Sequence, residues 1–267
     1  MNGAAPIGVF DSGLGGLTVA TELMRQLPAE GLLYFGDTAR MPYGPKAPST
    51  VRRYSREIAS FLEAEGVKAI VVACNTATAH ALTALRAELH VPVIGVIEPG
   101  ARAAVAATRS GNVGVIGTAG TVRSGAYERA IRELAPDARI TAQPCPLFVP
   151  LVEEGWTDTE ATRLVAREYL QPLREAAVDT VVLGCTHYPL LKPVLGEILG
   201  AGVRLIDSAA ETAAETRRVL AAKGIEAPPT AEPLRRFVAS DDSSQFLRLG
   251  QRFLGRPLDA VELHAFG

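Results

Sequence analysis

The chain has 267 residues, of which 48% are hydrophobic and 21% charged, and its formal net charge is -2. This composition is typical of a globular protein with a buried core, and it excludes a disordered chain and the basic footprint of a protein that binds nucleic acid or anionic membranes. No apolar run could cross a bilayer and residues 1–6 lack the features of a signal peptide, so we expect a cytoplasmic protein.

Short apolar runs alternate with helical patterns along the chain. The runs predict strands at Ile7–Phe10, Leu32–Phe35, Ala69–Ala73, Val93–Ile97, Val113–Ile116, Ile140–Ala142, Thr180–Leu183 and Val203–Ile206. Helical patterns lie between them, among others at Val51–Glu65, Thr76–Glu88, Gly125–Leu134 and Thr159–Ala176. Continuous runs of Val, Ile and Leu are typical of parallel strands covered on both faces. The alternation therefore predicts a doubly wound α/β fold.

The chain also repeats itself. Three pairs of segments match in the same order: Ile7–Ser12 with Val113–Thr118, residues 67–74 (VKAIVVAC) with 178–185 (VDTVVLGC), and Ile94–Glu98 with Val203–Asp207. Their separations are nearly equal, at 106, 111 and 109 residues. A regular internal repeat indicates duplicated structural units. We therefore expect two similar parallel-sheet domains, residues 1–98 and 99–207, related by a pseudo-two-fold axis.

The remaining residues, 208–267, are too few for a domain. They begin with a helical stretch, Ala209–Lys223, followed by a polar link, Glu226–Pro233, an apolar piece, Arg236–Ser240, and a last helix. We expect this C-terminal segment to pack back on the first domain.

Residues suited to chemistry follow the predicted strands, and ligands of open parallel sheets bind beyond the carboxyl ends of the strands. They lie in Asp11–Gly13, the loop 36–44 (GDTARMPYG), Cys74–Thr76, residues 118–121 (TAGT), Pro144–Glu153 and Cys185–His187. The repeat places Cys74 and Cys185 at equivalent strand ends. At a strand-to-helix junction the helix dipole and free N–H groups favour a thiolate, and His187 could tune Cys185.

Two cysteines at equivalent strand ends suggest a two-base reaction. If the two halves face each other across a cleft, a thiolate can remove a proton from one face of a carbon while a thiol delivers one to the other face. The active site is then expected in this cleft. Cys145, between Pro144 and Pro146, lacks polar companions and is interpreted as structural.

Four segments resemble the glutamate racemases of the aspartate/glutamate racemase family. They are DSGLGG from Asp11, GDTARMPYG from Gly36, ACNTAT from Ala73 and GCTHYPLL from Gly184. The resemblance runs from Ile7 to about Ser208. It implies a cofactor-independent isomerase that interconverts L- and D-glutamate with no bound metal. It also implies a supply of D-glutamate for peptidoglycan biosynthesis in the cell wall, which maintains cell shape, and a homodimer.

The resemblance also implies roles for individual residues. Cys74 and Cys185 correspond to the two catalytic bases, and Asp11, Glu153 and His187 to the residues that assist them. The substrate contacts that it implies are Asp11, Ser12, Pro42, Tyr43, Gly44, Asn75, Thr76, Thr118, Thr121, Thr186 and His187.

Other kinds of site are weaker alternatives. The glycines after Asp11 have Thr18 where a dinucleotide site needs a third glycine, and an anion-binding loop suits them better. Zinc held by Cys74, Cys185 and His187 would need a further ligand. Pyridoxal phosphate needs a lysine, and only Lys46 of the four lysines lies in a candidate loop. An aspartate racemase and a non-catalytic binding protein stay open as alternatives.

Overall fold

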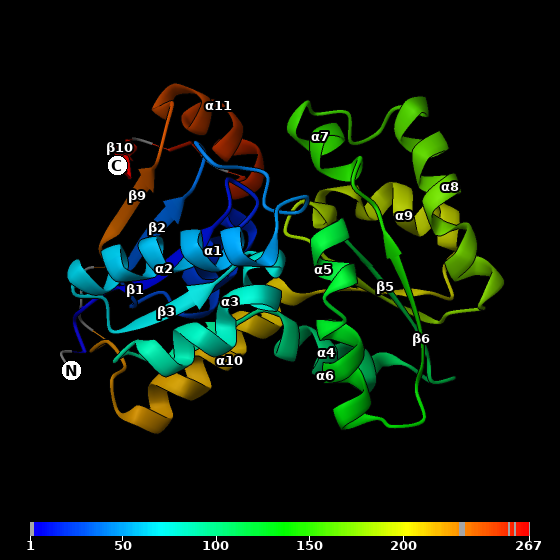
Figure 1. Ribbon diagram of the computed structural model, residues 1–267, viewed down its shortest axis with the longest axis horizontal. Helices are drawn as coiled ribbons and strands as arrows, with labels where there is room; N and C mark the ends of the chain where they lie inside the picture. The colour runs from blue at the N-terminus through cyan, green and yellow to red at the C-terminus, as the bar shows by residue number, and fades with distance from the viewer. Residues whose placement is uncertain (1–2, 230–232, 256, 259, 267) are drawn as a thin grey trace. The chain divides into compact units, whose positions relative to one another are not determined.

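The computed structural model describes residues 3–229, 233–255, 257–258 and 260–266. Residues 1–2 of the predicted first domain lie outside the described residues, as do 230–232, 256, 259 and 267 of the predicted C-terminal segment. The chain forms two compact units, one of Met1–Val96 with Ala209–Gly267 and one of Ile97–Ser208. Each unit is a parallel sheet with helices (Figure 1), which confirms the predicted fold class of two α/β domains.

The first unit has a six-stranded sheet in the order β10-β9-β2-β1-β3-β4. Its strands are β1 Ile7–Asp11, β2 Leu32–Gly36, β3 Ala69–Val72, β4 Val93–Gly95, β9 Arg235–Ala239 and β10 Glu262–Leu263. Its helices are α1 Leu17–Gln26, α2 Pro48–Ala64, α3 Asn75–Glu88, α10 Ser208–Lys223 and α11 Ser243–Leu254. Every residue of β1, β2 and β3 is buried, as the apolar runs predict for strands covered on both faces.

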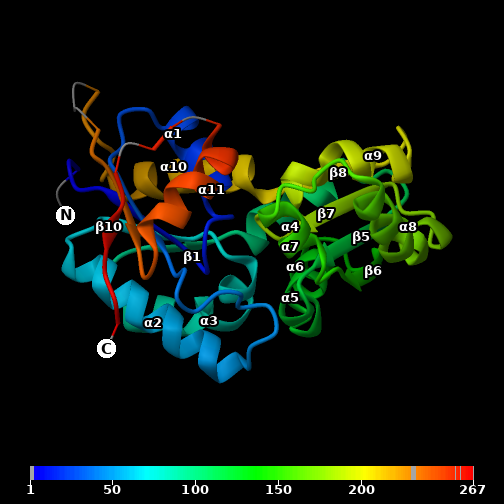
Figure 2. The ribbon, with the colours of Figure 1, turned by 90° about the horizontal axis from the view of Figure 1, so that it is seen from above.

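Helices cover both faces of this sheet. Helices α2 and α3 pack together on one face, and α1, α10 and α11 lie on the other (Figure 2). Apolar side chains from α2 and α3 fill the core beneath the sheet, among them Ile58, Leu62 and Leu85, which are fully buried. Helix α2 begins with Pro48 at its first turn, where a missing N–H costs nothing.

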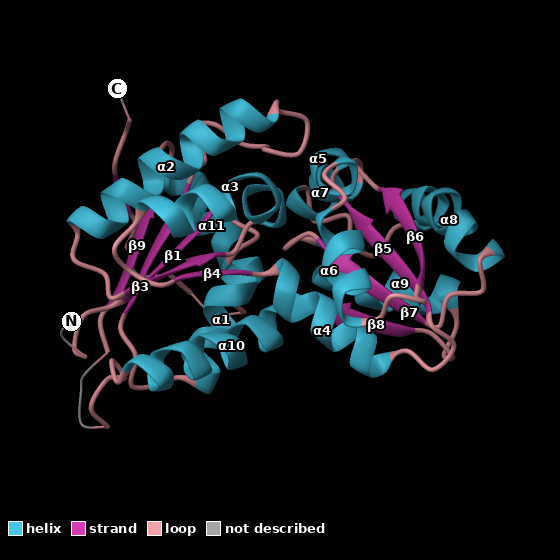
Figure 3. Ribbon diagram, turned by 60° about the horizontal axis from the view of Figure 1, so that its bottom comes forward, coloured by secondary structure: helices cyan, strands magenta, loops and turns pink. Residues whose placement is uncertain are grey.

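The second unit has a four-stranded sheet in the order β6-β5-β7-β8. Its strands are β5 Asn112–Gly117, β6 Arg139–Pro144, β7 Thr180–Gly184 and β8 Arg204–Asp207. Its helices are α4 Ile97–Ala107, α5 Ala119–Arg123, α6 Ala126–Leu134, α7 Phe148–Glu153, α8 Glu160–Glu175 and α9 Lys192–Leu199, with a 3₁₀ turn, η1, at Tyr188–Leu191. Helices α4 and α6 lie on one face of the sheet, and α8 and α9 on the other (Figure 3).

The two sheets share one topology. The order β2-β1-β3-β4 in the first unit corresponds to β6-β5-β7-β8 in the second. The strands that match in the sequence are therefore equivalent in the fold: β1 with β5, β3 with β7, and β4 with β8. The first sheet is wider because β9 pairs with β2 beyond this common core.

The fourth predicted strand ends two residues earlier than expected. The apolar run Val93–Ile97 forms a strand only to Gly95, because Ile97 already begins α4. Glu98 and Pro99 lie in the first turn of that helix, where an acidic side chain and a proline are both favourable.

A buried ion pair joins distant segments of the first unit. Lys68 Nζ lies 2.5 Å from Glu30 Oε2 and donates to the carbonyl of Gly3 at 2.6 Å. Glu30 Oε1 accepts from the backbone N–H of Ala227 at 2.8 Å. Both charged side chains are almost completely buried. The pair therefore connects the start of the chain to the segment that follows α10.

Replacing Lys68 with methionine should destabilise the protein by about 3–5 kcal/mol, because the Glu30 carboxylate is left buried without its counterion. Urea unfolding followed by circular dichroism at 222 nm measures the change. Adding Glu30→Gln to this variant removes the buried charge but keeps an acceptor for Ala227, so it should restore much of the loss. An unchanged urea midpoint for Lys68→Met would contradict this account.

Candidate active site

In the first unit, Cys74 lies between the end of β3 and the start of α3. The residue is 5% exposed and caps the helix: its Sγ accepts from the backbone N–H of Ala77 at 3.4 Å. The Cys74 thiol also donates to Ser12 Oγ at 3.6 Å. Asn75 and Thr76, in the first turn of α3, are buried as well. The helix N-terminus therefore supplies the dipole and the N–H donor that favour a thiolate.

Asp11 ends β1, the strand beside β3. Its side chain is buried, and Oδ2 accepts from the backbone N–H of Gly13 at 2.9 Å. Tyr34, on β2, donates to the carbonyl of Gly13 at 2.9 Å. Burial, reinforced by the negative charges of Asp11 and Cys74, raises the pKa of Tyr34 well above its usual value. Tyr34 therefore stays a neutral hydrogen-bond donor that fixes the loop after β1.

The loop after β2 carries Pro42, Tyr43 and Gly44. Pro42 is exposed and follows a cis peptide bond, while Tyr43 and Gly44 are buried. The Tyr43 hydroxyl donates to Asp37 Oδ2, so this side chain is turned toward the polar cluster at the start of the loop. Burial and then the nearby Asp37 carboxylate raise the Tyr43 pKa far above its usual value.

In the second unit, Cys185 follows β7 but caps no α-helix. A helix N-terminus is expected near both cysteines, but near Cys185 it is only that of the short 3₁₀ turn η1, whose N-cap is His187. The chain turns through residues 185–187 into η1, and α9 starts only at Lys192. Pro189 and Pro193 lie near the starts of these two helical elements, where proline lacks the N–H that a continuous helix would need.

His187 takes the place of the helix beside Cys185. Its Nδ1 lies 3.9 Å from Cys185 Sγ and 3.5 Å from Thr186 Oγ1, and its Nε2 lies 3.0 Å from Glu153 Oε1 at the end of α7. Burial lowers the pKa of His187, but the hydrogen bonds to Cys185 and Glu153 and their charges outweigh it and raise this pKa to about 10. The imidazole is therefore a cation at neutral pH, and a cation stabilises a neighbouring thiolate.

Thr118 and Thr121 lie at the end of β5, the strand beside β7. Thr118 caps α5 and accepts from the backbone N–H of Thr121 at 3.2 Å, and the two hydroxyls are 3.1 Å apart. The second unit therefore gathers Cys185, Thr186, His187 and Glu153 in direct contact, and it places two hydroxyls at the same edge of the sheet.

Cys145 does not belong to the group formed by Cys185, Thr186, His187 and Glu153. It is completely buried, its thiol donates to the carbonyl of Gln143 at 3.6 Å, and burial, followed by the charge of Cys185, raises its pKa well above the usual value. A thiol whose pKa is raised is a poor base at neutral pH. Within the described part of the chain, no group of three His, Cys, Asp or Glu side chains is arranged to hold a metal ion.

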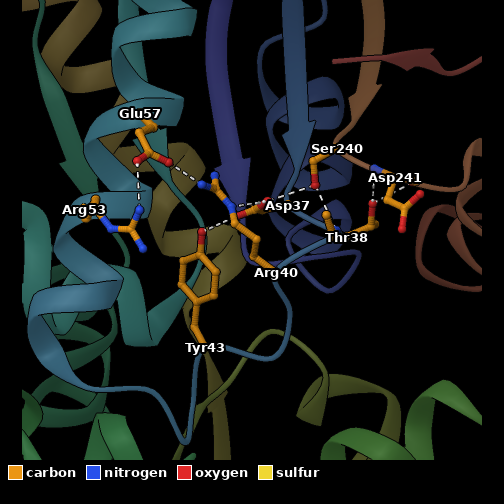
Figure 4. A network of polar contacts seen from close by, with 9 residues as sticks. Asp37, Thr38, Arg40, Tyr43, Arg53, Glu57, Ser240 and Asp241 are labelled. Atoms are coloured by element: carbon orange, nitrogen blue, oxygen red, sulfur yellow. Dashed lines mark hydrogen bonds and ion pairs between the residues drawn. The ribbon is translucent and has the colours of Figure 1, made fainter. Parts of the chain in front are cut away.

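The sequence interpretation missed the cluster around Asp37. This carboxylate, Arg40, Tyr43, Glu57 and Ser240 form one network (Figure 4). Asp37 and Arg40 both belong to the loop motif of residues 36–44. They are three residues apart, so an ion pair between them could have been expected from the sequence. Ser240 is 203 residues from Asp37. It ends the apolar run of β9, so reading the residue after every strand would have found it.

The fold is that of an α/β racemase. The family model for Asp/Glu/hydantoin racemases matches residues 7–216, and the chain belongs to this family. It is an amino-acid racemase, which is an isomerase.

The chain is similar in sequence and structure to glutamate racemases. A glutamate racemase of Geobacter metallireducens is 57% identical over 255 residues, which cover 96% of this chain and 94% of that protein. The crystal structure of the glutamate racemase isoform RacE1 from Bacillus anthracis has a TM-score of 0.93 at 43% identity, covering 98% and 97% of the two chains. That of Francisella tularensis, in complex with D-glutamate, has a TM-score of 0.92 at 36% identity, covering 98% of each.

The charge on His187 can be tested by titration. Because its pKa is raised from about 6.5 to about 10, the charged ring stabilises the fold fully below pH 6.5, and this stabilisation is lost as the pH rises through 10. Glu153→Gln should lower the pKa of His187 by about one pH unit or more, because an opposite charge is removed. The pKa of His187 can be measured by nuclear magnetic resonance of the imidazole during a pH titration. Glu154→Gln is the control. Titration of wild-type His187 near pH 6.5 would contradict the assignment.

Proposed function

We propose that this chain interconverts L- and D-glutamate without a cofactor, with Cys74 and Cys185 as the two bases. One observation carries the proposal: the equivalent strands β3 and β7 are each followed, within two residues, by a buried cysteine that has its own polar partners. A carboxylate-binding protein would not need two such thiols. The similarity to glutamate racemases supports glutamate as the substrate.

Cys185 and Cys74 are suited to opposite starting roles. The charged His187 favours the thiolate of Cys185, and Glu153 holds the ring from its other nitrogen. The Cys74 thiol donates to Ser12 and can become a thiolate at the N-terminus of α3 once it has given up its proton. Asp11, buried at the end of β1, assists on the Cys74 side.

The reaction needs one thiolate and one thiol on opposite faces of the glutamate α-carbon. The thiolate takes the α-proton, and the electron pair of the broken C–H bond stays on the carbon. The opposite thiol then donates its proton to this carbon, which inverts the configuration and leaves the second sulfur as the thiolate. The protonation states of the two cysteines have been exchanged, so the enzyme is ready for the reverse direction.

Most of the proposed donors to the two carboxylates of the substrate are neutral. The proposed contacts are Ser12, Asn75, Thr76, Thr118, Thr121 and Thr186, with Asp11, Pro42, Tyr43, Gly44 and His187. Because the Tyr43 hydroxyl is bonded to Asp37, this residue contributes its backbone or ring. A dianionic ligand that is taken out of water without such donors would bind poorly.

The biological role follows from the product. D-Glutamate is a component of bacterial peptidoglycan, so the enzyme supplies cell-wall synthesis and works in the cytoplasm, where that synthesis begins. We further propose that it is a homodimer. No helix among the described residues has the length and hydropathy of a membrane span.

Optical rotation tests the substrate and the two bases together. Pure protein given L-glutamate alone should bring the rotation to zero, whereas L-aspartate should stay almost unchanged. Cys74→Ala and Cys185→Ala should each abolish racemisation, and the double variant should be little worse, because the two thiols act as a unit. Cys145→Ala is the matched control and should stay active. If only aspartate is racemised, the protein is an aspartate racemase and the proposed substrate is wrong. If neither amino acid is racemised, a non-catalytic binding protein is favoured.

Isotope incorporation tests the two-base mechanism. In deuterated water the thiol proton exchanges with solvent, so D-glutamate formed at a few per cent conversion should carry deuterium at the α-carbon while unreacted L-glutamate carries little. The same should hold when D-glutamate is the substrate. Mass spectrometry distinguishes deuterium from protium at the α-carbon of the product and of the unreacted substrate. A product that retains protium in both directions would indicate a single base, even if both cysteines proved essential.

A further inference from the structure

Asp37 is the centre of the polar cluster at the start of the loop that carries Tyr43 and Gly44. Its side chain is completely buried. Oδ1 accepts from Ser240 Oγ at 2.8 Å, Oδ2 accepts from the Tyr43 hydroxyl, and both oxygens accept from Arg40 Nε, at 3.0 and 2.8 Å. A buried carboxylate needs such partners, so each of these side chains is held in place.

Arg40 connects this carboxylate to helix α2 and to the end of the chain. It pairs with Glu57 of α2, and its guanidinium lies 4.1 Å from the ring centre of Tyr54 and 4.5 Å from that of Phe266. The guanidinium is therefore covered by two aromatic rings, an arrangement that favours a flat cation. Its Nε pairs with Asp37 and its Nη1 with Glu57, so it links the start of the loop to α2.

The C-terminal segment holds the same loop at a second place. Ser240 Oγ accepts from the backbone N–H of Ala39 at 2.9 Å, while the Thr38 hydroxyl donates to the carbonyl of Asp241 at 2.7 Å (Figure 4). Phe266 is fixed in turn, because its ring lies 5.4 Å from Phe35 and 5.0 Å from His264. Residues far beyond the racemase motifs therefore determine where residues 38–44 lie.

We propose that Arg40 and Phe266 are positioning residues for substrate binding: the ring of Phe266 holds the Arg40 guanidinium on Asp37, and Asp37 holds the Tyr43 hydroxyl and so the substrate loop. Neither residue needs to touch glutamate. This inference rests on the proposed function, since it takes Tyr43 and Gly44 as substrate contacts. It gives the C-terminal segment a part in substrate affinity.

The positioning role can be tested by measuring the steady-state kinetics of variants at Arg40 and Phe266. Arg40→Lys keeps the charge but loses the flat fork and its stacking, and Phe266→Leu keeps an apolar side chain but loses the ring face. Each should raise the KM for glutamate by about 10- to 100-fold, as expected when substrate contacts are misplaced. The kcat should change much less, because the loop contributes binding that is equal in the ground and transition states. Phe266→Tyr restores a ring and should keep the wild-type KM.

Arg53→Lys is the matched control for Arg40. The Arg53 guanidinium also lies over the ring of Tyr54, at 4.8 Å, and near Glu57, at 3.7 Å, but the side chain is well exposed, so its replacement should leave KM unchanged. A second measurement needs no turnover: glutamate should protect Cys74 from alkylation less well in Phe266→Leu than in the wild type, while the alkylation rate without glutamate stays the same.

The outcomes separate the two proposals. If the wild type does not racemise glutamate, the proposed function fails. If the wild type is active and Phe266→Leu and Arg40→Lys both keep its KM, the positioning role alone is overturned. A fall in kcat with an unchanged KM would overturn it too. If Arg40→Lys does not fold, the comparison of Phe266→Leu with Phe266→Tyr decides.

Discussion

Parallel pairing is the constraint on which the site depends. When all strands of a sheet run in one direction, their carboxyl ends meet at one edge, and so do the starts of the helices that follow them. In the first unit this edge gathers Asp11, Asp37, Cys74 and Ser240, each from the end of a different strand. In the second unit it gathers Thr118 and Cys185. The apolar sequences of the strands do no chemistry, yet they decide which polar residues become neighbours.

The fold could be predicted largely from the sequence because its signals are local. Buried parallel strands show as short runs of Val and Ile, and the duplication shows as matching segments such as 67–74 and 178–185. The common strand order of the two sheets now gives that match a structural meaning. The end of the fourth strand was less predictable, because Ile97 is apolar in either a strand or a helix.

The candidate site was predictable wherever a motif follows a strand, and less so where contacts join distant segments. Cys74 and Cys185 could be found from their place in the repeat. Ser240 could be found as a residue that follows a strand, but its contact with Asp37 and the contact of Phe266 with Arg40 could not be predicted. Pairing of β9 with β2 and of β10 with β9 brings these segments together, and no local pattern records it. The turn after β7 escaped prediction for another reason: prolines delay the helix, and a histidine supplies the positive charge instead.

The surroundings of the two thiols are unlike, since one caps a helix and the other lies beside a charged imidazole. For the proposed reaction, thermodynamics limits the effect that this difference can have on the rates in the two directions. L- and D-glutamate have the same free energy in water, so the equilibrium constant is one and kcat/KM must be equal in the two directions. The unlike surroundings of the two thiols can make kcat and KM differ between the two directions, but only by the same factor, so that the ratio kcat/KM stays equal. The equal free energies of the two enantiomers therefore keep the proposed net reaction symmetric, although the surroundings of the two proposed bases differ.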